Sequence, residues 1–211
     1  MSIVTYNNRS IRNISAIPGA AESLTHIKTL TASSSSTLSF VNGSDDVVLD
    51  STYPIYLFKF IGIHPSADGE DLQFNMSADS GSNYNVTKTT TAFRAFHNEA
   101  GNDTNLSYHT GEDLAQGTGF QSISYETDNA NDSGISGTLN LFNPSSTTFV
   151  KHFIAQTSSC LDGGASYGIY NLNFLTAGYG NTTSAIDAVQ FKMSSGNIDA
   201  GTIKLYGIKD S

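Results

Sequence analysis

The segment Gly164-Ala165-Ser166-Tyr167-Gly168 matches G-x-S-x-G, the pattern in which many hydrolases carry a nucleophilic serine. In those enzymes the serine sits on a strained turn between a strand and a helix, which presents its hydroxyl group to the substrate. Here the segment follows Asp162-Gly163 and precedes Ile169–Phe174, which has the pattern of a strand. A nucleophilic serine of this kind requires a helix after the motif, whereas a strand is expected there. We therefore interpret Ser166 as a loop residue and expect no catalytic residues and no enzymatic activity.

The histidines and the cysteine form no recognisable metal motif. No histidine pair has the H-E-x-x-H spacing of a zinc site. His97 and Glu99 would share one face of a strand, but they supply only two ligands. Cys160 is the single cysteine, so neither an intramolecular disulfide nor a cysteine-based zinc site can form. We expect no cofactor and no metal among these residues, and strand-end or surface positions for His26, His64, His97, His109 and His152.

Two acidic loops could offer oxygen ligands to calcium. They are Asp68-Gly69-Glu70-Asp71 and the segment from Asp128 to Gly134. The second loop lacks the EF-hand pattern, because Ala130 occupies a ligand position and no glutamate closes the loop. Solvated turns are the favoured interpretation, and a calcium ion at a subunit contact stays open. The sequence neither indicates nor excludes a pair of carboxylates for glycoside hydrolysis, because the distance between two carboxylates depends on the fold.

The composition argues against nucleic acid and membrane partners. The formal net charge is −9, from 19 acidic and 10 basic residues, and no basic cluster interrupts it. Such a surface repels phosphate backbones and anionic lipid headgroups. The longest apolar stretch, Ile55–Ile63, is interrupted by Lys59 and is too short to span a bilayer. The first residues, Met1–Asn7, show no secretory signal.

Strand-like segments alternate with turns through most of the chain. Leu72, Phe74 and Met76 alternate with polar neighbours, which indicates a strand with one buried face. Ile55–Ile63 is apolar on both faces, which is typical of a central strand. Further strands are expected at 86–97, 120–125, 135–142, 148–157, 169–176, 185–193 and 201–208, with 101–119 as the longest loop. Turn signals about 8–12 residues apart are typical of sandwiches. We predict an all-β, antiparallel, jelly-roll-like β-sandwich of about eight to ten strands over residues 26–211.

Residues 1–25 are polar and lack periodicity, and we assign them to an extended N-terminal arm. Two interpretations stay open, an ordinary frayed end and an arm docked on a neighbouring protein. The apolar residues of the arm are numerous enough to grip a partner but too few to build a core. Its arginines, in an otherwise acidic protein, could meet an acidic surface. The residues expected to bind a partner are Tyr6, Arg9, Ile11, Arg12, Ile14 and Ile17.

Four segments of the sequence resemble those of a known group of proteins. They are Ser2–Ser10, Tyr56–Pro65, Asp79–Tyr84 and Gly201–Ile208. Together they resemble β-sandwich virion structural proteins of tailed bacteriophages of marine bacteria, a group of capsid decoration proteins, head fibres and tail fibre components. The likeness covers nearly the whole chain and contains strand and turn sequences without a catalytic signature.

The resemblance implies a non-enzymatic virion protein on the particle surface, assembled in the host cytoplasm, with capsid decoration or cement as the leading role. Its expected partners are further copies of itself, as a homotrimer or larger symmetric assembly, and major capsid or tail proteins. One alternative is a tail fibre or receptor-binding module, in which loops such as Gly101–Gly119 touch a host glycan or protein. A carbohydrate-binding or carbohydrate-active domain is another. The absence of tryptophan weakens it, since most Tyr and Phe residues fall in strands.

Overall fold

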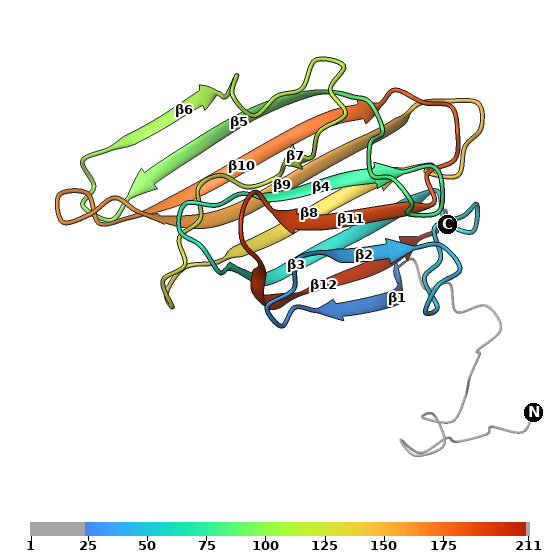
Figure 1. The fold of residues 1–211 in the computed structure, drawn as a ribbon. Coiled ribbons are helices and arrows are strands. Elements are labelled where there is room, and N and C mark those ends of the chain that lie inside the picture. The colour runs from blue at the N-terminus through green and yellow to red at the C-terminus, as the bar shows by residue number, and fades with distance from the viewer. Residues whose placement is uncertain (1–23, 210–211) are drawn as a thin grey trace, which may run out of the picture.

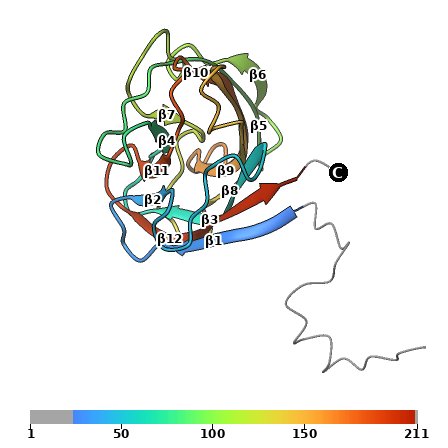
Figure 2. The same ribbon diagram turned by 90° about the vertical axis from the view of Figure 1, so that its right-hand side faces the viewer.

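The computed structural model describes residues 24–209, which form twelve strands and no helix (Figure 1). The strands lie in two antiparallel sheets, a large sheet with the order β1-β12-β3-β8-β9-β10-β5-β6 and a small sheet with the order β2-β11-β4-β7. Figure 2 shows the sheets as two facing layers. The predicted all-β sandwich is confirmed. The strands are β1 (Leu24–Thr31), β2 (Leu38–Val41), β3 (Ile55–Pro65), β4 (Leu72–Ser77), β5 (Lys88–Asn98), β6 (Thr104–Tyr108), β7 (Gln121–Ser122), β8 (Ile135–Phe142), β9 (Lys151–Asp162), β10 (Ile169–Gly180), β11 (Ala188–Met193) and β12 (Ile198–Ile208).

Eight of the strands follow the jelly-roll plan. β1 pairs with β12 in the large sheet and β2 pairs with β11 in the small sheet, so the first strands of the chain lie beside the last. β3 then lies between β12 and β8, and β4 lies between β11 and β7. This alternation between the sheets is the double Greek key of a jelly roll.

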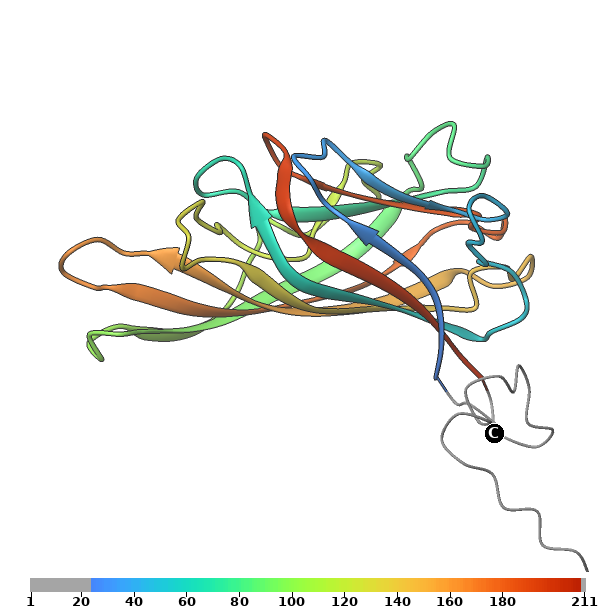
Figure 3. The same ribbon diagram turned by 90° about the horizontal axis from the view of Figure 1, so that it is seen from below.

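The other four strands extend the large sheet beyond β8. β5 and β6 are inserted between β4 and β7, and β9 and β10 are inserted between β8 and β11. The small sheet ends at β7, so the described residues provide no further strand to face them. Figures 1 and 3 show one end of the β9–β10 and β5–β6 hairpins projecting past the small sheet.

The core lies between the sheets and is centred on an aromatic cluster. Phe191 of β11 lies 5.2 Å from Phe58 and 5.3 Å from Phe60, both on β3, measured between ring centroids. Phe40 of β2 adds an edge-on contact to Phe58 at 5.3 Å. These rings are almost completely buried. Edge-on aromatic pairs contribute about 0.5–1.5 kcal/mol each beyond the burial of their area.

The apolar pattern on both faces of β3 predicts that both faces are buried, but only its inward face is buried. Its inward side chains, such as Phe58 and Phe60, are buried as expected of a central strand. Its outward side chains are not, and Ile61 is 47% exposed, because residues 24–209 place no second layer on that side of the large sheet. We call this side the outer face. Large apolar side chains exposed on it are Leu24, Ile61, Phe93, Leu106, Tyr108 and Ile154.

Two segments differ from the sequence prediction. β6 lies within 101–119, which was expected to be loop, and it escapes detection because its one large aliphatic side chain, Leu106, is 69% exposed. The strand expected over 120–125 is only β7, since the hydroxyl of Ser124 rather than a backbone carbonyl accepts the N–H of Leu72. β1 also begins at Leu24, inside the range assigned to the arm.

Candidate functional site

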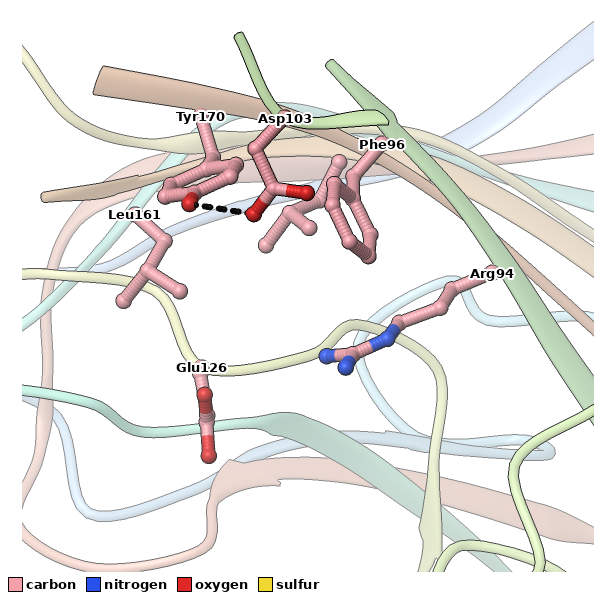
Figure 4. A pocket seen from close by; sticks show the side chains of 7 residues that line it. Arg94, Phe96, Asp103, Glu126, Leu161 and Tyr170 are labelled. Carbon is pink, nitrogen blue, oxygen red and sulfur yellow. Dashed lines mark hydrogen bonds between the residues drawn. The ribbon is translucent and has the colours of Figure 1, made fainter. Parts of the chain in front are cut away.

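A pocket of about 240 Å³ opens on the inner face of the large sheet, at the projecting end that the small sheet does not cover (Figure 4). It combines three charged side chains with two aromatic rings and two leucines. The lining residues are Arg94, Phe96, Asp103, Glu126, Leu161, Tyr170 and Leu172.

Strand alternation brings the floor of the pocket together. Every second residue of a strand faces the same side, so Phe96 on β5 points inward with Tyr170 and Leu172 on β10. Leu172 lies opposite Phe96 in the β5–β10 pairing, and Tyr170 lies opposite Leu161 in the β9–β10 pairing. The Phe96 and Tyr170 rings meet edge-on at 5.5 Å. The floor is therefore a fixed apolar surface built on three adjacent strands.

Arg94 enters the pocket from β5 between two aromatic rings. The carbon of its guanidinium group lies 4.3 Å from the ring centroid of Tyr125 and 5.3 Å from that of Phe96. Its Nε is buried without a hydrogen-bond partner, and no carboxylate of residues 24–209 comes within 4.0 Å of the group. Figure 4 shows the guanidinium end of Arg94 directed towards the segment that carries Glu126, whose side chain points away from Phe96, Asp103 and Tyr170. Arg94 is thus held by cation–π contacts while its charge lacks a close counter-ion.

Asp103 is positioned by the turn between β5 and β6. The side-chain Oδ1 of Asn98 accepts the backbone N–H groups of Asn102 at 3.1 Å and Asp103 at 3.0 Å. The Tyr170 hydroxyl donates to Oδ2 of Asp103 at 2.8 Å, as Figure 4 shows. Desolvation, followed by this hydrogen bond, raises the pKa of Tyr170 to about 12. At neutral pH the Tyr170 hydroxyl therefore stays protonated and donates the hydrogen bond that orients the Asp103 carboxylate.

Glu126 comes from the segment after β7, where the backbone is strained. Its φ is +37°, a left-handed conformation that side chains other than glycine adopt at a cost of about 1–3 kcal/mol. Its N–H donates to Oδ1 of Asp71 at 2.7 Å, and the next residue, Thr127, forms a bridge to Glu70. Burial raises the pKa of Asp71 to about 7, and the hydrogen bond from Glu126 opposes that rise. These contacts hold the Glu126 backbone in place beside the pocket.

Comparison with protein-family models, with curated proteins and with solved structures found no match to this chain. The assignment of a function therefore rests on the residues and their geometry. Residues 24–209 contain no helix that is long and apolar enough to cross a membrane.

The partner-binding residues predicted from sequence, Tyr6, Arg9, Ile11, Arg12, Ile14 and Ile17, lie outside the described residues. Ser166 lies in the loop between β9 and β10, so two strands flank the G-x-S-x-G segment and the strand–turn–helix context of a nucleophile is missing there. Of the segment 101–119, which the sequence offered as a contact loop, Asp103 lines the pocket. The other lining residues were not predicted as a site, because their pattern is that of ordinary strands.

The two acidic loops are neighbours in the fold. Oδ1 of Asp68 accepts the N–H of Asn129 at 3.4 Å, and burial, with the charge of Asp68 as a further cause, raises the pKa of Asp128. Asp128 also accepts the N–H of Asp162. Even so, residues 24–209 contain no group of three or more His, Cys, Asp or Glu side chains arranged to hold a metal ion.

Proposed function

We propose that this chain is a non-enzymatic structural protein of the phage virion, placed on the particle surface as a capsid decoration or cement protein. The resemblance in the strand and turn sequences supports the class. The double Greek key supports it too, because jelly rolls are frequent among viral capsid proteins, although lectins share the architecture. A fold alone does not specify a function. The observation that carries the proposal is the uncovered outer face.

The outer face carries exposed apolar side chains among polar ones. Ile61 on β3 and Ile154 on β9 are 47% and 45% exposed, and β8 lies between their strands. Beside Ile154, a groove of about 510 Å³ is lined by Phe142, His152 and Tyr179 among others. An exposed groove lined largely by apolar side chains is a frequent kind of interaction site in a folded protein. A chain that is both acidic and apolar on one sheet face suits assembly on a particle, as a homotrimer or along a lattice.

Charged substitutions on the outer face test this proposal. The double variant Ile61→Asp, Ile154→Asp should fold, since both side chains are half exposed, but should lose self-association and binding to purified particles. Tyr167→Asp is the matched control, because Tyr167 is 44% exposed in the β9–β10 loop rather than on the outer face. Analytical ultracentrifugation and particle co-sedimentation are the measurements. A wild-type chain that stays monomeric at high concentration and does not bind particles would refute the proposal.

The copy number separates decoration from the tail fibre alternative. Quantitative mass spectrometry of purified particles should find this chain at a number comparable with the major capsid protein if it decorates the lattice. A far smaller number supports a fibre or receptor-binding module. That second candidate is favoured by one observation, the pocket around Arg94, to which the segment 101–119 contributes Asp103.

A further inference from the structure

Three charged groups reach the pocket with hydrogen-bonding capacity to spare. Arg94 has a buried Nε without a partner and no carboxylate of residues 24–209 within ion-pair distance. Asp103 accepts one hydrogen bond from Tyr170, which leaves other lone pairs of its two oxygens available. Glu126 uses its backbone N–H, and not its carboxylate, to bond Asp71. The pocket is thus lined both by the donors of Arg94 and by the acceptors of Asp103 and Glu126.

The pocket also presents an apolar platform. Phe96, Tyr170 and Leu172 project from adjacent strands, so their positions are fixed by the sheet pairing rather than by a loop. The pocket volume is about 240 Å³, slightly smaller than the sites of about 300–1,000 Å³ that hold drug-sized ligands. One small ring fits such a space, whereas a larger ligand would extend beyond it.

We infer that this pocket binds a single neutral pyranose ring of a glycan. A pyranose has an apolar C–H face, which would lie on the apolar side chains of Tyr170, Leu161 and Leu172, and a rim of hydroxyl groups that both donate and accept. The carboxylates of Asp103 and Glu126 accept from hydroxyl groups, and the guanidinium group of Arg94 donates to hydroxyl oxygens. The inference deepens the recognition alternative described above and does not depend on capsid decoration.

Charge selects a neutral ring over charged ligands. One guanidinium group stands against two carboxylates in the pocket, so an added carboxylate, as in a uronic acid, meets a net negative site. A cationic ligand meets the guanidinium group of Arg94, which lies over the rings of Tyr125 and Phe96 and has no carboxylate of residues 24–209 within 4.0 Å, so like-charge repulsion opposes its binding. The pocket therefore favours glucose-, galactose- or mannose-like rings over uronates and over lysine side chains.

Titration of the full-length, isotope-labelled chain tests the inference by NMR. The probes are methyl glucoside, methyl galactoside and methyl mannoside, with glucuronate, an acetylated lysine amide and the acyclic polyol sorbitol for comparison. At least one neutral pyranoside should give saturable shifts at residues 94–103, 125–126, 161 and 170–172, with a dissociation constant in the millimolar range expected of one shallowly bound ring. Tighter binding of glucuronate or of the lysine amide, equal binding of sorbitol, or no saturable shifts would overturn it.

Matched variants assign the binding to the pocket. Asp103→Asn and Glu126→Gln keep the side-chain shapes but remove the charges, and each should weaken pyranoside binding about tenfold. Asp45→Asn is the control, because Asp45 is exposed between β2 and β3 and its positive φ of 49° suits asparagine. Unchanged affinity in both pocket variants, with their spectra showing a folded chain, would also overturn the inference. Loss of sugar binding leaves particle binding intact, so the two proposals fail separately.

Discussion

The side-chain amino group of Lys88 on β5 donates a 2.6 Å hydrogen bond to Oδ1 of Asn75 on β4, which joins the large sheet to the small sheet inside the core. Both side chains are completely buried. A second bond of 2.8 Å goes to the carbonyl of Val86, and no carboxylate of residues 24–209 pairs with Lys88. Burial lowers the pKa of Lys88 to about 7. The fold therefore holds a buried amine that is partly neutral at neutral pH.

Lys88→Met should flatten the pH dependence of stability in mildly alkaline solution. The unfolded chain keeps the ordinary lysine pKa of 10.5, so between about pH 7 and pH 10 it holds a proton that the folded chain lacks. Wild-type stability consequently rises with pH through this window, by at most about 1.4 kcal/mol per pH unit from this group. Urea unfolding at a series of pH values measures the slope. Parallel curves for variant and wild type would show that Lys88 stays charged in the folded chain.

Asp71 should act in the opposite direction at lower pH. Burial, with the charge of Glu112 as a further cause, raises its pKa from 3.8 to about 7. Between those pH values the folded chain holds a proton that the unfolded chain has lost, so this group makes stability fall as pH rises from about 4 to about 7.

Asp71→Asn imitates the protonated form and should remove that fall, making the variant relatively more stable at pH 8 than at pH 5. Its amide oxygen can still accept the N–H of Glu126, which keeps the segment in place. Chemical denaturation at the two pH values is sufficient. A stability difference from wild type that is the same at both would show that the Asp71 carboxyl titrates normally.

Phe58→Ala should cost about 3–5 kcal/mol of unfolding free energy, because Phe58 is fully buried against Phe40 and Phe191 and its removal leaves a cavity. Phe149→Ala is the matched control, since Phe149 is 71% exposed and should change stability by less than about 0.5 kcal/mol. Guanidinium titrations of both variants provide the comparison. If Phe58→Ala unfolds with the wild-type midpoint, β3 is peripheral to the core.

Side-chain alternation was enough to predict the sandwich and most strands, because burial on one face leaves a period of two in the sequence. β8 (Ile135–Phe142) is predicted to the residue for this reason. The same signal fails at β6, where Leu106 faces solvent, and at the outer face of β3, where apolar residues such as Ile61 do not pack within residues 24–209. An apolar pattern favours burial, but a folded surface also exposes many apolar atoms to water, so the pattern alone does not say which apolar positions are covered.

The pocket could not be predicted because its parts come from four separate stretches of the chain. Asp103 and Tyr170 are far apart in sequence and meet only because β5 and β6 are inserted next to β10. In the sequence Arg94 is an isolated charge within a strand, and only the fold brings its guanidinium group over the ring of Tyr125. Spacing along the chain carries no trace of such contacts, which arise from the order of strands in the sheet.

Gly207→Ala should destabilise the sandwich through crowding at the edge of the core. A methyl group at Gly207 would lie 2.3 Å from the ring of Tyr53, which packs directly on this strand. Forcing the ring away should cost about 1–3 kcal/mol. Gly119→Ala is the control, because no atom lies within 4 Å of the added methyl group. Thermal unfolding compares them, and equal melting temperatures for the two variants would show that Tyr53 moves aside freely.

Deletion of residues 2–20 should separate folding from assembly. Among residues 24–209 the buried hydrophobic cluster runs from Ala32 to Leu205, so the deletion removes none of these members and should leave the melting temperature nearly unchanged. If the arm grips another particle protein through Tyr6, Ile11, Ile14 and Ile17, as the sequence predicts, the truncated chain should fold but no longer join particles. Complementation of particles with the truncated chain, followed by quantitative mass spectrometry, gives the occupancy. Wild-type occupancy would contradict a role for the arm and would favour the outer face, with Ile61 and Ile154, as the proposed attachment surface.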